Sequence, residues 1–290
     1  MDFDDYQHKA LATDQRPAGD DAVVIPLLGL AGEAGNLLSE YKKRLRDGSS
    51  HAEYEVLVAE ELGDLLWYVA NLASKFNLSL SEIAEANLYK VNDRWNADHR
   101  SYPPFFDHSF PESEQLPRTF EVSFTQRRLD GRMQTTAVHN GRPLGQFLTD
   151  AAATEDGYRF HDALHLAFAT YLGWSPVTRR NLNRKRRSDP LIDEEQDGGR
   201  AIVIEEAAAA HAYAYARRHN LLDDVSAVDF STLRAIRDLT APFEVAIRTS
   251  VEWQSAIVEG FRMFRLLLKH GGGVVKGNLF DRTMVFIAPS

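Results

Sequence analysis

The chain has 290 residues, 44% of them hydrophobic, which allows one large domain or two ordinary ones and argues against global disorder. Its formal net charge of −9 argues against a protein that coats a nucleic-acid polymer, because such proteins need a basic surface. The absence of cysteine excludes disulfides and thiolate metal sites.

Neither targeting nor membrane insertion is indicated by the sequence. The N-terminus is polar and acidic, unlike a signal peptide. No apolar run approaches the roughly 20 residues that span a bilayer. We therefore expect a cytoplasmic protein with no membrane partner.

Helical periodicity dominates the first third of the chain. A short helix is expected at 5–12 and longer helices at 23–46, 52–76 and 79–95, joined by short loops. Pro26 fits only in the first turn of its helix. Long helices joined by short loops predict a helical bundle.

Carboxylate side chains recur at helical spacing inside two of these helices. Glu33, Asn36 and Glu40 share one face of the first long helix. Glu61 and Asp64 share one face of the next helix. If the two helices pack antiparallel, these faces can meet and direct several oxygens at one point. Hard oxygen ligands without cysteine suit Mg²⁺ or Mn²⁺ rather than zinc, and such a site fits phosphoryl chemistry on a nucleotide.

Glycines surround these acids, at Gly29, Gly32, Gly35 and Gly63. Each costs about 1 kcal/mol in a helix interior relative to alanine. Close approach of the helices, or room for a ligand beside the backbone, would justify that cost. The simpler alternative is an exposed acidic face with incidental glycines. Two glycine-flanked acidic pairs on adjacent helices favour the metal site over that alternative.

Residues 1–98 resemble the MazG-type all-α nucleoside triphosphate pyrophosphohydrolases. That family carries Glu-x-x-Glu on one helix, Glu-x-x-Asp on the next and an Asn/Lys pair on the following helix. The similar segments here are Glu33-Ala-Gly-Asn36, Glu61-Leu-Gly-Asp64 and Asn87-Leu-Tyr-Lys90, together with the opening Tyr6-Gln7. The family is typically dimeric or higher, so we expect a homodimer or a larger homo-oligomer.

The resemblance implies Mg²⁺-dependent cleavage of an NTP or dNTP between the α and β phosphates, which releases a monophosphate and pyrophosphate. It implies that Glu33, Glu61 and Asp64 hold the metal. It also implies that Glu61 or the neighbouring Glu60 orients or deprotonates the attacking water.

Substrate contacts follow from the same resemblance. Lys90, with Lys43, would balance the phosphate charge, and Asn87 would donate hydrogen bonds. Trp67 could stack on a base, although such an aromatic residue is more often part of a core.

Asn36 departs from the family pattern, which usually has a carboxylate there. An amide oxygen can ligate Mg²⁺ but brings no charge, so the site would hold fewer ions, or hold them more weakly, unless Glu40 moves in. The alternative function is a weakly active or inactive nucleotide sensor that signals through its C-terminal domain.

The rest of the chain predicts a linker at 99–117, rich in proline and phenylalanine, and an accessory domain at 118–290. Two alternating runs around Asp130-Gly131 predict a β-hairpin within 119–138, to which 283–288 could add a third strand. Helices are expected at 158–172, 201–219, 231–239 and 242–270. The predicted fold class is therefore mainly α, a MazG-like helical bundle plus a second helical domain with a small antiparallel β element.

The accessory domain holds a second candidate site. His161 and His165 are separated by four residues, a spacing that can bind a metal, and Asp162, Glu205 and Glu206 are acids of the same region. We consider a second metal or nucleotide site, or a catalytic centre, against the simpler interpretation of a buried polar network.

Two further features of this domain leave alternatives open. The basic segment 179–187 is interpreted as a solvated surface, with a phosphate-facing patch as the alternative. The Glu60-Glu61 helix can be laid over the Glu205-Glu206 helix, so the domain could be a degenerate second copy of the first. The domain also resembles C-terminal domains found fused to MazG-type modules.

Overall fold

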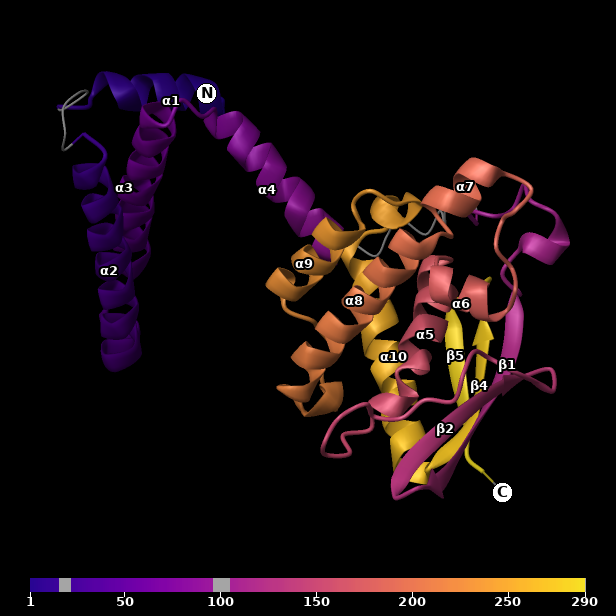
Figure 1. The fold of residues 1–290 in the computed structure, drawn as a ribbon. Helices are drawn as coiled ribbons and strands as arrows, with labels where there is room; N and C mark the ends of the chain where they lie inside the picture. Colours follow the sequence, from indigo (N-terminus) through magenta and orange to yellow (C-terminus); the bar gives the residue numbers. More distant parts are fainter. Residues whose placement is uncertain (16–21, 96–104, 290) are drawn as a thin grey trace. The chain divides into compact units, whose positions relative to one another are not determined.

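The structure is a computed structural model that describes residues 1–15, 22–95 and 105–289. It divides into two compact units, an N-terminal unit, Met1–Asn92, and a C-terminal unit, Asp93–Ser290 (Figure 1). The predicted fold class, mainly α with a small antiparallel sheet, is confirmed. Within the described ranges, no helix has the length and apolar character needed to cross a membrane.

The N-terminal unit contains the expected helices. Helices α2 and α3 form a long hairpin, and α1 lies across the end of α3 (Figure 1). Ala10, Ala70 and Leu80 form a small core, against which Tyr6 and Trp67 pack. The bounds are α1 Phe3–Ala12, α2 Val24–Asp47, α3 Tyr54–Lys75 and α4 Leu80–Trp95, with a 3₁₀ turn at Gly48–Ser50.

Gly29 has the role expected of a glycine at a close helix contact. A Cβ atom placed on Gly29 would lie 2.2 Å from the ring of Tyr68 on α3. Such a distance is far below van der Waals contact, so α2 can approach α3 here only because the residue lacks a side chain.

The C-terminal unit is built around α5 (Asp162–Leu172), whose residues are almost all buried. The long helix α10 (Ser250–His270) packs along α5, and both helices cover one face of the sheet (Figure 1). Trp174 and Trp253, which are 1% and 0% exposed, anchor the surrounding core. The remaining helices are α6 Pro176–Asn181, α7 Pro190–Glu195, α8 Gly199–Arg217 and α9 Phe230–Thr240.

The helices predicted for this unit are present, but the predicted end residues of some of them are wrong. Residues 158–160 form a 3₁₀ turn before α5, and the predicted helix 242–270 begins only at Ser250. Thr249 caps that helix, because its side chain accepts from the Glu252 amide while the Glu252 carboxylate accepts from the Thr249 amide. The short helices α6 and α7 were not predicted.

The sheet has five antiparallel strands in the order β3-β2-β1-β4-β5. The predicted hairpin is confirmed, with Leu129 opposite Arg132 and positive φ at both Asp130 and Gly131. The predicted C-terminal strand is also present, but it joins through β4, which was not predicted and which places Asn278 opposite Thr119. The bounds are β1 Thr119–Leu129, β2 Arg132–His139, β3 Arg142–Pro143, β4 Gly272–Asn278 and β5 Thr283–Ile287.

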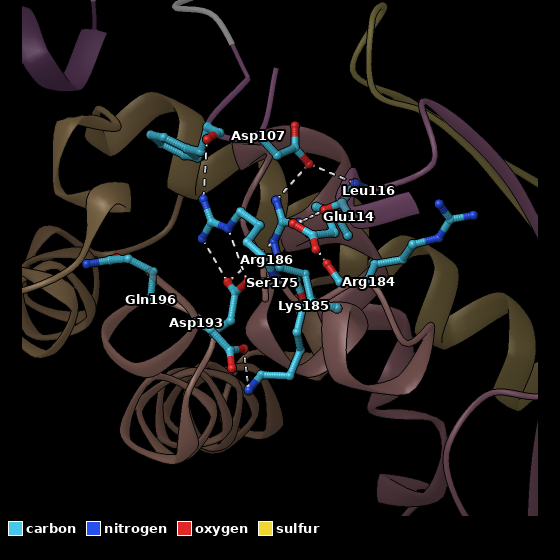
Figure 2. A network of polar contacts seen from close by, with 12 residues as sticks. Asp107, Glu114, Leu116, Ser175, Arg184, Lys185, Arg186, Asp193 and Gln196 are labelled. Atoms are coloured by element: carbon cyan, nitrogen blue, oxygen red, sulfur yellow. Dashed lines mark hydrogen bonds and ion pairs between the residues drawn. The ribbon is translucent and has the colours of Figure 1, made fainter. Parts of the chain in front are cut away.

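Residues 105–117 of the predicted linker pack within the C-terminal unit; residues 99–104 lie outside the described ranges. Asp107 is 1% exposed and accepts a hydrogen bond from the Leu116 amide at 2.7 Å (Figure 2). It also accepts from Arg118 and Arg179, each at 2.7 Å. This ion-paired contact holds the segment in place.

The interpretation of 179–187 as a solvated basic surface is wrong for Arg179 and Arg186. Arg179 and Arg186 are 0% and 1% exposed. Arg186, which is labelled in Figure 2, lies within a network of polar contacts. It is 2.7 Å from both Asp197 and Glu244. Charged groups survive such burial because each guanidinium meets carboxylates with good hydrogen-bonding geometry.

Replacing Asp107 by asparagine should destabilise the C-terminal unit by about 3 kcal/mol, because Arg179 would lose a buried counter-charge. Burial alone would raise the pKa of Asp107, but Arg179, Arg118 and the Leu116 amide outweigh it and lower this pKa below its ordinary value of 3.8. The stabilisation is therefore complete above pH 3.8 and is lost as the pH falls through the lowered value. Urea unfolding should show the difference between wild type and variant at neutral pH and a shrinking difference in acid. An equal difference at every pH would contradict this explanation.

Candidate functional site

An acidic cluster forms where α2 meets α3. Glu33 of α2 and Glu61 and Asp64 of α3 each direct one carboxylate oxygen into a group whose members all lie within 4.8 Å of one another. The i, i+3 spacing on α3 and the antiparallel packing of the hairpin produce this convergence. The structure thus brings together three of the predicted ligands, hereafter the acidic cluster.

The charges and the burial of the acidic cluster favour the binding of a cation. Desolvation of Glu61, and then the negative charges of Glu33 and Asp64, raise the pKa of Glu61. Its Oε2 atom is buried and, among the described residues, has no hydrogen-bond partner. No lysine or arginine of the described ranges forms an ion pair with the three acids. A hard divalent ion would satisfy the unpartnered oxygen and offset the repulsion.

The positions of Asn36 and Glu40 differ from the prediction that both ligate the metal. The Asn36 amide donates to Glu33 Oε2 at 2.7 Å, so it acts as a donor to the cluster rather than as a ligand. Glu40 is buried, accepts a hydrogen bond from Lys43 and lies 2.9 Å from His51 Nε2. Glu40 and Lys43 therefore neutralise each other, and neither reaches the acidic cluster.

Three glycines leave open space beside the acidic cluster. A Cβ atom placed on Gly32, Gly35 or Gly63 would meet no atom within 4 Å. These residues are not needed for close packing within one chain, in contrast to Gly29. They leave room next to the backbone for a ligand or for another chain.

The remaining predicted residues of this unit are not gathered around the acids. Glu60 is exposed on the face of α3 next to Glu61, and Asn87 and Lys90 are exposed on α4. The start of α4 is held to α1, where the Leu80 amide donates to Gln7 at 2.7 Å. Trp67 donates to Thr13 Oγ1 at 2.8 Å and packs on the small core, so a base-stacking role is not supported within one chain.

The predicted residues of the C-terminal unit do come together. His161 and His165 on the α5 side meet Glu206 on α8, with one ligand atom of each within 4.8 Å of the others. Glu205 is fully buried and accepts from His165, and Asp162 is buried beside them. We call His161, His165 and Glu206 the His–Glu cluster.

Sequence reasoning missed that Gln146, Arg180 and Asn181 line the same cavity as His161 and Glu206. Arg180 belongs to the basic segment that the sequence singled out, but its place in the lining of this cavity, with His161, depends on the packing of α6. Ser175 was also missed; its Oγ donates to Glu205 at 2.6 Å. The degenerate-copy hypothesis for this unit stays a prediction.

Comparison with known proteins identifies a family to which the chain is related. The model of the MazG C-terminal domain family matches residues 101–290. The chain is 38% identical to the gene 37 protein of Mycobacterium phage L5 over an alignment of 101 residues, which covers 32% of this chain and 89% of that protein. No solved structure matches the chain. Since the match spans the whole C-terminal unit from residue 101 onward, the chain belongs to the MazG C-terminal domain family.

Proposed function

We propose that the chain is a Mg²⁺-dependent nucleoside triphosphate pyrophosphohydrolase, which cuts an NTP or dNTP between the α and β phosphates. The observation that carries this proposal is the acidic cluster, with its oxygens within 4.8 Å and the buried, unpartnered Oε2 of Glu61. The resemblance of residues 1–98 to MazG-type enzymes and the MazG family of the C-terminal unit support it.

Glu33, Glu61 and Asp64 would hold Mg²⁺, with Mn²⁺ as a substitute. A bound Mg²⁺ supplies charge neutralisation at the phosphate oxygens. The attacking water forms a bond to the α phosphorus while the bond from that phosphorus to the bridging oxygen breaks, so that pyrophosphate leaves. Glu61 would accept the proton of the water, since it lies within the acidic cluster where the metal and the attacking water would meet. The exposed Glu60 is the competing candidate.

We also propose that the N-terminal unit self-associates. Its fully buried core is small, while many large apolar side chains of α2 and α3 are exposed. Leu28, Leu38 and Leu45 on α2 are each 68–70% exposed, and Val56 on α3 is 69% exposed. Apolar surface of this extent on a soluble helical hairpin marks an interface. A second copy would cover it and could bring Asn87 and Lys90 of α4 to the phosphates.

A second candidate function, a nucleotide sensor with little or no turnover, is favoured by one observation. Asn36 stands where the family usually has a carboxylate, and its amide donates to Glu33 instead of bringing charge to a metal. Tight nucleotide binding without pyrophosphate release would favour this function over hydrolysis.

Replacing Glu61 by glutamine should lower Mg²⁺-dependent pyrophosphate release by about 100-fold or more, because one residue supplies both a ligand and the proton acceptor. The assay measures pyrophosphate from a panel of NTPs and dNTPs. Glu55→Gln, an exposed change on the same helix, is the matched control and should keep wild-type rates. Retention of activity in Glu61→Gln, together with its loss in His161→Ala, would instead place catalysis in the C-terminal unit.

Replacing Asn36 by glutamate should lower the Mg²⁺ concentration needed for half-maximal activity by several-fold, because a fourth carboxylate adds charge and an oxygen ligand. Measurement of initial rates across a Mg²⁺ series would detect the shift. Ser81→Glu on α4 adds the same charge away from the cluster and is the matched control. Gln7 is unsuitable as a control position, because it bonds to the start of α4. An unchanged Mg²⁺ requirement in Asn36→Glu would mean that position 36 does not face the metal.

Replacing Leu38 by arginine should weaken self-association, because the charge would have to be buried in the proposed interface. Light scattering coupled to size-exclusion chromatography reports the mass of wild type and variant. Leu191→Arg is the matched control, since Leu191 is 60% exposed on α7 of the C-terminal unit. Equal masses for all three proteins would contradict an interface on α2.

A further inference from the structure

The His–Glu cluster opens onto a cavity of about 470 Å³ in the C-terminal unit. His161, Asp162 and Glu206 form one wall of this cavity, and Arg180 and Asn181 line it as well. The His–Glu cluster is therefore supported by the surrounding protein and is accessible from the cavity.

The partners of the two imidazole rings fix which nitrogen carries a proton. His161 Nδ1 lies 2.9 Å from the carbonyl oxygen of Tyr158, and His165 Nδ1 lies 2.7 Å from Glu205 Oε1. Both partners can only accept, so both Nδ1 atoms must donate. In a neutral ring, Nε2 then carries the lone pair, and it is this atom that a metal would bind.

The two Nε2 atoms converge on one carboxylate. Glu206 Oε2 lies 3.3 Å from His165 Nε2 and 3.8 Å from His161 Nε2. His165 Nε2 is buried and, within the described ranges, has no hydrogen-bond partner of good geometry. Acceptor atoms that face one another in this way repel unless a cation lies between them.

The support behind His165 is of the kind that metal-binding histidines have. Glu205 is 0% exposed and accepts from Ser175 Oγ at 2.6 Å, from the Val177 amide at 2.7 Å and from His165. A carboxylate held in this way orients the ring and increases its strength as a ligand. Glu205 is thus a positioning residue rather than a ligand.

We propose that His161, His165 and Glu206 bind a divalent transition-metal ion of the Zn²⁺ type, with an open coordination position toward the cavity. Ligand atoms about 2.1 Å from a tetrahedral zinc ion lie roughly 3.4 Å apart, close to the 3.3 and 3.8 Å measured here. Two imidazole nitrogens with one carboxylate suit such an ion and not Mg²⁺, which prefers oxygen.

A proton is the competing occupant of this position. Burial disfavours a charged His165, but Glu205 and Glu206 outweigh that effect and raise its pKa to about 10. Without a metal, the ring is therefore an imidazolium held between two carboxylates. This alternative is a purely structural ion pair and predicts no specific metal binding.

The test is Zn²⁺ binding to the full chain, measured by calorimetry or by competition with a chromophoric chelator, with excess Mg²⁺ present to occupy oxygen sites. Wild type should bind one Zn²⁺ per chain. His161→Ala and Glu206→Gln should each weaken this binding at least about tenfold, and Glu205→Gln should weaken it by about 10- to 100-fold. His211→Ala, on the same helix as Glu206, should bind as wild type does.

Glu206→Gln is the decisive variant, because its side chain is 38% exposed and an amide keeps its shape, so folding should be preserved. Co²⁺ substitution adds an independent readout, since visible absorption bands would disappear in this variant. Equal Zn²⁺ affinity in wild type and Glu206→Gln would overturn the proposal. Zn²⁺ binding that is lost in Glu61→Gln but kept in Glu206→Gln would overturn it too, by placing the ion at the acidic cluster. Neither result depends on pyrophosphate release.

Discussion

Repulsion between three carboxylates is the constraint on which the N-terminal unit depends. The α2–α3 hairpin holds Glu33, Glu61 and Asp64 with oxygens within 4.8 Å of one another, although like charges at this separation oppose one another. One oxygen of Glu61 is buried without a partner among the described residues. A bound cation removes both penalties at once. The proposed phosphate chemistry, and the choice between hydrolysis and sensing, would therefore depend on how well a metal is held.

The two units support cation binding in different ways. The acidic cluster offers oxygen ligands on a hairpin with a small core and much exposed apolar surface, which the proposed self-association would cover. The His–Glu cluster offers two nitrogens and one oxygen, and its α5 residues sit in a thoroughly buried core. One chain can thus carry a hard site for Mg²⁺ and a softer site for Zn²⁺ without competition between them.

Local sequence patterns correctly predicted the features that depend on residues close together in the chain. Helical spacing predicted the acidic cluster, and Asp130-Gly131 predicted the hairpin. Helical spacing did not indicate the contact of Glu40 with His51, because His51 comes from the loop after α2. Gly271 ends α10. The φ values of 136° and 139° at Gly272 and Gly273 let β4 start against β1, which a run of glycines does not indicate. The burial of Arg179 was equally hidden, because its counter-charges lie far away in the sequence.

The central claim is that the acidic cluster binds a divalent metal, and anomalous diffraction from crystals of the full chain grown with Mn²⁺ tests it most directly. Mn²⁺ takes the same oxygen ligands as Mg²⁺ and scatters strongly enough to be located. The account predicts an anomalous peak between Glu33, Glu61 and Asp64, with the Glu61 Oε2 atom among its ligands. Ordered carboxylates with no peak between them, at saturating Mn²⁺, would contradict the account.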